Sequence, residues 1–284
     1  MFFLGVDLFF VVSGLIMAET TRQLNPGLRT ASRFLWNRFS RIYSGWWPFF
    51  LVYLAGFLYF NRLRPEIDLL GSLFLWPQNL TKYLLPITWT LSFELYFYCG
   101  LAAMIFWSRQ RAPHVLIVIG GIVAFLNLYF LLSGLYLPAN EERAKEYLFV
   151  PFFASPLILE FIGGFLLGEW LHRRPQRNVW PWAVGAALLF TVAFYYQNYV
   201  PLNKSGMAGF FHVVERTVLL GGFSICVAAI LVIIEQDHDF APFKLFQRLG
   251  DASYSIYLSH IFVLSLSTIL FTRPPPSLRL PFNL

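Results

Sequence analysis

Charged residues are scarce in this sequence. Asp, Glu, Lys and Arg make up 13% of its 284 residues, whereas a soluble globular domain usually carries about 25%. A chain with about half that share of charge has too few polar side chains to cover its surface in water. The composition therefore excludes an ordinary water-soluble domain.

Cysteine is also scarce, and the chain has no low-complexity segment or obvious repeat. Cys99 and Cys226 each lie inside an apolar block, without the spacing of a disulfide framework or a metal site. We interpret both as buried free thiols and expect no metal. No cleavable signal peptide is evident, because nothing basic precedes the first apolar run and no small-residue cleavage site follows it.

The sequence is rich in apolar blocks of membrane-spanning length. Hydrophobic residues make up 57% of the chain, and its mean hydropathy is +0.60. The blocks run for about 15 to 22 residues, close to the length of helix that crosses a hydrocarbon core. Trp and Tyr, which favour the headgroup interface, stand at or near many block ends. We therefore predict an all-α, polytopic transmembrane helical bundle.

Eight membrane spans are clear from the apolar blocks. They are Phe2–Ala18, Tyr43–Phe60, Thr88–Trp107, Val115–Leu135, Pro156–Leu171, Val179–Gln197, His212–Ile234 and Ser253–Phe271. A ninth candidate, Leu69–Leu85, contains Pro77, Gln78, Asn79 and Lys82, and we interpret it as an interfacial or re-entrant segment. We predict one membrane domain over residues 1–272, followed by a short Pro-rich tail at 273–284.

The distribution of basic residues predicts the orientation. If Leu69–Leu85 does not cross, the loops Glu19–Ile42, Ser108–His114, His172–Asn178 and Glu235–Gly250 share one side and hold 12 of the 21 basic residues. By the positive-inside rule that side is cytoplasmic. The net charge of +6 then reflects cytoplasmic loops and membrane lipid headgroups, and we expect no nucleic-acid partner.

Glu94 is the strongest candidate for function among the charges inside spans. A charge at this depth is costly and marks a functional site by default. Thr90 and Tyr98 lie one helical turn to either side on the same face. The carboxylate could act as a base or orient a reacting group. The alternative is a polar tie between helices through Tyr98 or an arginine.

Other polar residues within spans allow two interpretations. Asp7 lies near a helix end, where an acid also stabilises the helix, and the sequence does not decide between that role and a functional one. Glu160 is close to a span end, so we expect an interfacial carboxylate. Glu215 and Arg216 are adjacent, and we expect each to pair with another helix. His260 is typical of a hydrogen-bonded buried imidazole, with proton transfer as the alternative.

Arg38 and Arg41 are three residues apart, so they share one helical face near the predicted cytoplasmic side. Guanidinium groups suit phosphate oxygens, which they bind with two hydrogen bonds. Such a pair could hold a cytosolic ligand with several phosphates. Taken alone, the residues favour the alternative, which is anchoring to anionic lipid.

Small residues predict close helix packing. Ser13-Gly14, Gly163-Gly164 and Gly168 lie within apolar spans. Such residues allow two helix backbones to approach closely.

Four blocks of the chain, in order, resemble the acyltransferase-3 family of bacterial membrane O-acyltransferases, especially its exopolysaccharide-acetylating branch. They are GVDLFFVVSGLIM at Gly5–Met17, RFLWNRFSRIY at Arg33–Tyr43, LLPITWTLSFELYFY at Leu84–Tyr98 and LGDASYSIYLSH at Leu249–His260. Each block alone is weak, because it consists mostly of aromatic and small residues. Four in family order across nearly the whole chain are specific.

The resemblance implies a ten-span enzyme of the bacterial cytoplasmic membrane. It would carry an acyl group, usually acetyl, from cytosolic acetyl-CoA to a hydroxyl of an extracytoplasmic or lipid-linked carbohydrate, beside polysaccharide-synthesis machinery. Arg38 and Arg41 match the arginine pair linked to coenzyme A, and Glu94 matches the functional acid of the family. Ser13 belongs to an S-G-F-L motif in which Leu15 replaces the Phe.

Three further residues are assigned to the acceptor from the same resemblance. We expect Trp89, Tyr98 and Asp7 to shape the acceptor cavity, together with Ser13. His260 belongs to the last-helix block, so we do not assign it the central role in acyl transfer.

The sequence departs from the family pattern at its start. The resemblance implies a preceding helix that carries an arginine and, about ten residues later, a histidine central to acyl transfer. This chain starts at what resembles the second family helix, so we expect an N-terminally truncated chain. A nine-span remainder would favour Leu69–Leu85 crossing after all, or a span hidden in a long loop.

Two other functions stay open from the sequence. A transporter or flippase of a polyprenyl-linked sugar would use the same polar residues as a path, although neither inverted repeats nor paired broken helices are evident. A catalytically inactive scaffold in a polysaccharide-export complex would follow from the missing histidine. The first hypothesis is the acyl-CoA-dependent O-acyltransferase.

Overall fold

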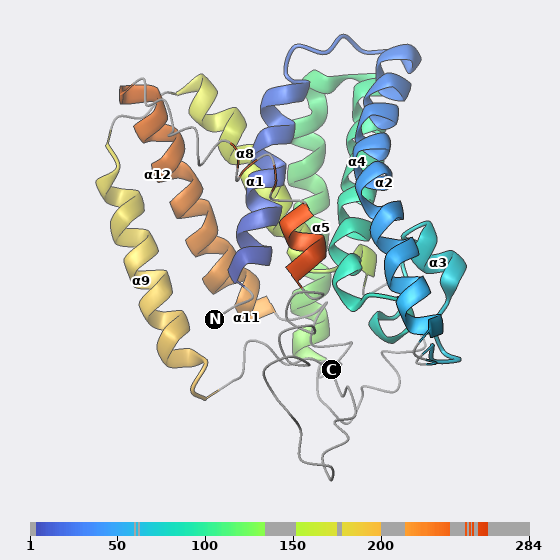
Figure 1. The fold of residues 1–284 in the computed structure, drawn as a ribbon. Helices are drawn as coiled ribbons and strands as arrows, with labels where there is room; N and C mark the ends of the chain where they lie inside the picture. The colour runs from blue at the N-terminus through green and yellow to red at the C-terminus, as the bar shows by residue number, and fades with distance from the viewer. Residues whose placement is uncertain are drawn as a thin grey trace. The chain divides into compact units, whose positions relative to one another are not determined.

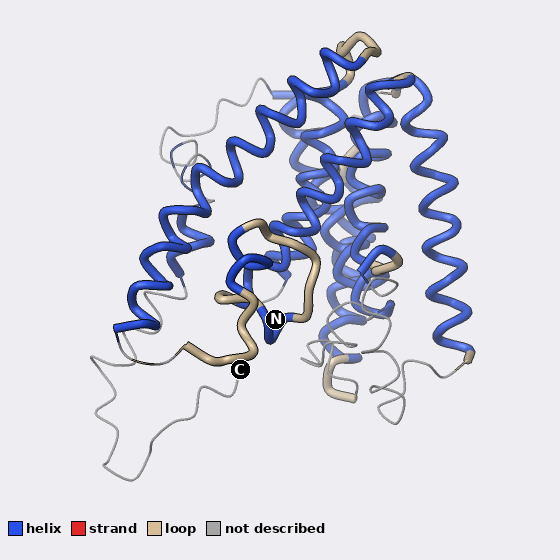
Figure 2. The backbone as a smooth tube through the Cα atoms, turned by 90° about the vertical axis from the view of Figure 1, so that its right-hand side faces the viewer, coloured by secondary structure: helices blue, strands red, loops and turns tan. Residues whose placement is uncertain are grey.

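The computed structural model describes residues 4–59, 61, 63–133, 152–174, 178–199, 214–238, 248, 250, 252 and 255–260. All regular secondary structure in these ranges is helical (Figure 2). The chain forms two compact units, one of Met1–Ser40 with Pro65–Ala241 and one of Arg41–Arg64 with Pro242–Leu284. The predicted all-α class is confirmed.

Within the described ranges, four helical segments are long and apolar enough to cross a membrane. They are Leu4–Thr21, Pro86–Trp107, Arg109–Leu132 and Val214–Gln236. They contain α1 (Leu4–Thr21), α4 (Trp89–Trp107), α5 (Ala112–Leu132), and α11 (Val214–Arg216) with α12 (Gly222–His238). α8 (Leu157–Arg173) and α9 (Trp180–Tyr196) are shorter. Each corresponds to one of the clear spans of the sequence.

The connecting segment Glu19–Ile42 is helical in most of its length, which agrees with the helical face predicted for Arg38 and Arg41. α2 runs without a break from Leu28 to Tyr59. Gly27, with φ of 140°, makes the turn that precedes it. Leu28–Ile42 contains four Arg and two Leu residues, and both residue types favour helix. Leu28–Ser40 belongs to the first unit and the remainder of α2 to the second.

The segment Leu69–Leu85 does not form one spanning helix, as predicted. It contains a five-residue α-helix, α3 (Leu69–Leu73), and a 3-10 turn at Leu80–Lys82. The Asp68 side chain caps α3 by accepting a hydrogen bond from the Gly71 amide at 2.9 Å. Pro77 and Pro86 limit how far either helix can extend.

Tyr83 closes this segment against α4. Its hydroxyl donates to the Trp76 carbonyl at 2.8 Å and lies 2.7 Å from the Ser92 hydroxyl. The side chain is 1% exposed. Burial raises the pKa of Tyr83 from 10.0 to about 12, and the hydrogen bond with Ser92 offsets part of that rise.

We expect this tyrosine to make the protein less stable at high pH. Below pH 10 both the folded and the unfolded tyrosine keep the proton, so the free energy of unfolding does not change. Between pH 10 and about 12 only the unfolded phenol ionises, so the free energy of unfolding should fall by up to about 2–3 kcal/mol. Denaturant titrations in detergent should show this slope, reduced in Tyr83→Phe; an identical slope in the variant would contradict the assignment.

α1 and α8 form the core of the first unit (Figure 1). A Cβ added at Gly14 would collide with the backbone of Phe161 and Phe165, and one at Gly164 would collide with the Val11 carbonyl. Phe10 contacts the rings of Trp89, Phe93 and Phe97 on α4. The predicted close packing of small residues is confirmed for both glycines.

Replacing Gly164 with alanine should separate these two helices. The new methyl group meets backbone atoms, which cannot move aside as a side-chain end can. We expect a loss of about 1–3 kcal/mol or more in the free energy of unfolding. Gly121→Ala on α5 is the matched control, because a Cβ there meets nothing within 4 Å and alanine favours helix. Equal thermal stability of both variants would contradict this packing.

The two cysteines differ from the prediction in their burial. Cys99 and Cys226 are free, as expected, but Cys99 is exposed on the helix surface and Cys226 is half-buried. The predicted last span, Ser253–Phe271, lies mostly outside the described residues; residues 255–260 of it are helical. The predicted Pro-rich tail at 273–284 also lies outside them, and the single domain over 1–272 stays a prediction.

Candidate active site

Arg38 lies on α2 against an aromatic pair. Its guanidinium carbon is 5.6 Å from the ring centre of Phe34 and 5.7 Å from that of Tyr98. Its Nη2 donates to the Thr20 hydroxyl at 3.2 Å. The side chain is half-exposed. These contacts fix the orientation of the Arg38 guanidinium. The exposed part of the guanidinium remains accessible to a ligand.

Tyr98 connects Arg38 to Glu94. The Tyr98 hydroxyl donates a short hydrogen bond to the Glu94 carboxylate, one turn earlier on α4. Tyr98 is buried and Glu94 is half-buried. The predicted pairing of Glu94 with Tyr98 on one helical face is confirmed. The arrangement runs from a guanidinium near the end of α1, through a phenol, to a carboxylate deeper in the bundle.

Arg41 follows Arg38 on the same helix, and its side chain is exposed. It belongs to the second unit, so its place relative to Tyr98 and Glu94 is not described. The expected role of both arginines in holding phosphates stays a prediction.

The four residues assigned to the acceptor, Tyr98 among them, are buried. Trp89 is 4% exposed and Ser13 is 9% exposed, and Trp89 packs edge-on against Phe93. Asp7 is fully buried and does not join the Arg38–Tyr98–Glu94 group. Their role at an acceptor cavity stays a prediction.

Asp7 forms an ion pair with Arg216. The Nε of Arg216 donates to Oδ1 of Asp7 at 2.9 Å, and its Nη2 donates to Oδ2 at 2.8 Å. Both side chains are at most 4% exposed. The expected pairing of Arg216 with another helix is confirmed, and it accounts for the buried Asp7 carboxylate.

Glu160 lies beside this ion pair, and the prediction of its environment from the sequence is wrong. We expected an interfacial carboxylate, but the residue is 1% exposed. It faces Asp7, Arg216 and Thr217. Within the described part of the chain, the two carboxyl oxygens of Glu160 have no hydrogen-bond partner, and the hydroxyl of Thr217 has none either. The nearness of Glu160 to a span end gave no sign of the helices that cover it.

Sequence reasoning also missed Arg109. Predicted as a loop residue, it is 4% exposed, and its Nη2 lies 2.6 Å from the Glu169 carboxylate. Its Nε donates to the Thr21 hydroxyl at 2.6 Å, and Nη2 also donates to the Ala18 carbonyl at 3.0 Å. It therefore joins the start of α5 to α1 and α8. The only signal in the sequence is Glu169, a second acid within an apolar span.

His260 lies in the second unit, on the helical residues 255–260. Its Nδ1 makes a short hydrogen bond with the Tyr257 carbonyl of its own helix. The expected hydrogen bond of the imidazole is confirmed, but the side chain is only half-buried, and a proton-transfer role stays untested. Among the described residues, no group of three His, Cys, Asp or Glu side chains could hold a metal ion.

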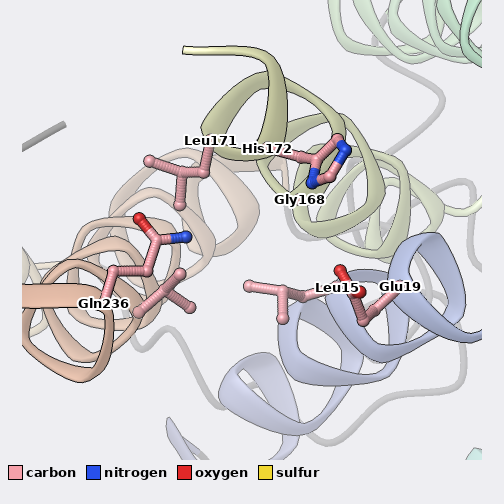
Figure 3. Close-up of a pocket in the computed structure, with 7 residues that line it drawn as sticks. Leu15, Glu19, Gly168, Leu171, His172 and Gln236 are labelled. Carbon is pink, nitrogen blue, oxygen red and sulfur yellow. The ribbon is translucent and has the colours of Figure 1, made fainter. Parts of the chain in front are cut away.

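A small cavity lies between α1, α8 and α12 (Figure 3). Its volume is about 60 Å³, and Glu19, His172 and Gln236 are the polar side chains that line it. Ligand pockets usually measure about 300–1,000 Å³, so this cavity cannot hold a nucleotide. None of the predicted site residues lines it.

Comparison with known proteins identifies the family. The family model described as an acyltransferase domain, acyltransferase-3, matches residues 1–282. The chain is also 30% identical over 273 residues to the exopolysaccharide production protein ExoZ of Rhizobium meliloti (strain 1021), across 92% of this chain and 76% of the relative. No solved structure matches it. With a family model that covers nearly its whole length, the chain belongs to the acyltransferase-3 family.

Proposed function

We propose that the chain is an acyl-CoA-dependent O-acyltransferase that acetylates a hydroxyl of a bacterial exopolysaccharide or lipid-linked glycan. Family membership supports acyl transfer, and the relative named for exopolysaccharide production supports a glycan acceptor. The observation that carries the proposal is the Arg38–Tyr98–Glu94 arrangement. We also propose the bacterial cytoplasmic membrane as its location and polysaccharide-synthesis machinery as its partner.

Arg38 would hold the phosphates of the donor. Its half-exposed guanidinium is oriented by Phe34, Tyr98 and Thr20, so little side-chain freedom remains to be lost when a phosphate binds. Arg41, one turn along α2, would supply a second cation. Two guanidinium groups suit a diphosphate better than lysines would, because each offers a planar pair of donors.

Glu94 would position the reacting groups deeper in the bundle. The hydrogen bond from Tyr98 fixes the direction of its carboxylate. Coenzyme A separates its thioester from its phosphates by a long pantetheine arm, so a donor held at Arg38 places the thioester away from the arginines. Ester formation then joins the acceptor oxygen to the acyl carbon, and the coenzyme A thiolate leaves.

The release of coenzyme A tests this function. Membranes that contain the chain should release free thiol from acetyl-CoA at a rate that depends on added glycan acceptor. A transporter of a lipid-linked sugar would move glycan without consuming acetyl-CoA, and an inactive scaffold would do neither. Thiol release that is independent of acceptor, or absent with every glycan offered, would contradict the proposal.

A further inference from the structure

The buried group of Asp7, Glu160, Arg216 and Thr217 has no place in the donor arrangement. Asp7 and Glu160 lie in the first turns of α1 and α8. Arg38 instead contacts Thr20, at the other end of α1. Thirteen residues separate Asp7 from Thr20, which is about 20 Å at 1.5 Å per residue. The two polar groups therefore lie toward opposite ends of the same helix.

The charges of this group do not balance. Both oxygens of Asp7 accept hydrogen bonds from Arg216, so these two residues offset each other. Glu160 brings a second acid, and neither of its oxygens is bonded within the described ranges. A carboxylate buried without a hydrogen bond or its own counter-charge is costly. Among the described residues, this group therefore contains two acids and one guanidinium.

Among the described neighbours of Glu160, Arg216 is the one cation. α1 presents Asp7, α11 presents Arg216, and the π-helical segment Thr217–Gly221 presents Thr217. The contacts of α8 with α5 and α12 are apolar. Gly120 of α5 packs on Leu159 and Ile162 of α8, and Ile225 of α12 packs on Gly163 of α8. Among the described elements around Glu160, one guanidinium faces two carboxyl groups.

The backbone beside Glu160 contains a π-helical turn. Such turns are rare in proteins overall, and those that occur are often at functional sites. The segment Thr217–Gly221 is such a turn. A Cβ at Gly221, at its end, would lie 2.8 Å from Cγ and 2.9 Å from Oε1 of Glu160. Glycine at this position leaves the space that the carboxyl group occupies.

We propose that Glu160 is a proton-exchange site, and that it takes up the proton lost by the acceptor hydroxyl. This inference rests on the proposed function. In the step, the hydroxyl oxygen bonds to the acyl carbon, and the bond from that carbon to sulfur breaks with its electron pair on the coenzyme A thiolate. The hydroxyl proton passes to the Glu160 carboxylate, and solvent later receives it.

In this proposal the acceptor comes from the side opposite the donor phosphates. With Arg38 at one end of α1 and Asp7 at the other, the pantetheine arm would span the interval and the acceptor would meet the thioester near Glu160. Glu94 then orients the donor. Glu160, whose oxygens have no hydrogen-bond partner within the described ranges, receives the proton. Asp7 and Arg216 are positioning residues that hold the site together.

Infrared spectroscopy tests the proton site without any acyl transfer. Spectra of the purified protein in lipid, recorded as differences between acidic and alkaline pH, should contain a carboxylic-acid C=O band that Glu160→Gln removes. Glu215→Gln is the matched control, because this half-buried acid is adjacent to Arg216 in the chain, and it should keep the band. A band that survives in Glu160→Gln, or is lost equally in the control, overturns the proposal; so does its absence from the wild type.

Acetyl transfer tests the role of the proton site. Glu160→Gln should lower kcat by about a hundredfold or more, with KM for acetyl-CoA unchanged, because the donor site is untouched. Gly221→Ala should lower kcat as well while keeping the carboxyl group. A wild-type rate in Glu160→Gln overturns the assigned role. If the wild type itself transfers no acetyl group, the proposed function fails, and the infrared band still decides whether Glu160 exchanges a proton.

Discussion

Replacing Arg109 with alanine should cost about 3–5 kcal/mol of the free energy of unfolding, because it removes the buried partner of the Glu169 carboxylate and leaves only the exposed Arg173, at 3.6 Å. Arg109 and Glu169 are both at most 8% exposed. Removing the guanidinium also removes the donors to the Thr21 hydroxyl and the Ala18 carbonyl. Its contact with the Phe165 ring, 4.7 Å from the ring centre, is lost as well. Thermal and denaturant unfolding in detergent would measure the change.

Arg111 provides the control for Arg109. It lies in the same 3-10 turn, Arg109–Arg111, but its side chain is exposed. Arg111→Ala should change the free energy of unfolding by no more than about 0.5 kcal/mol. Arg109→Ala combined with Glu169→Ala should cost less than the sum of the single changes, because the two charges share one interaction. Strict additivity, or equal losses at both arginines, would show that the ion pair does not join the helices.

Arg38→Ala should weaken acetyl-CoA binding by about tenfold to a hundredfold, the range expected for one charge-assisted hydrogen-bond contact. Arg38→Lys should restore the affinity only in part, since an ammonium group cannot form the paired contact of a guanidinium. Equilibrium binding of labelled acetyl-CoA to the purified protein would measure both effects.

The matched control for Arg38 is Arg33, an exposed arginine on the same helix. Arg33→Ala changes the net charge by the same amount, so it should weaken donor binding only slightly. If Arg33→Ala and Arg38→Ala weaken binding equally, the effect is general attraction of the anion to a basic surface. In that case Arg38 is not a specific phosphate ligand.

The helix class and the positions of the four candidate spans among the described residues could be predicted, because an apolar run of about 20 residues is the length of helix that crosses a bilayer. The full length of α2 could not be predicted from the apolar blocks. Arginine favours helix, so a helix can begin within a charged stretch. α2 does so at Leu28.

The candidate site could be predicted only where its contacts are local. Glu94 and Tyr98 are four residues apart, so helical spacing alone places them together. The approach of Arg38 to Tyr98, and of Arg216 to Asp7, joins helices that are distant in the sequence. No spacing rule reports such contacts, and the burial of Glu160 depends on three other elements. A charge near a span end is therefore not a reliable sign of an interface.

The most direct test of the account is the transfer of labelled acetyl from acetyl-CoA to glycan in membranes that contain the chain. The account predicts label in an alkali-labile ester on the glycan with the wild type, and its loss with Arg38→Ala plus Arg41→Ala, while Arg33→Ala keeps it. Equal labelling by the wild type and the double variant, or no labelled glycan with the wild type, would contradict the account.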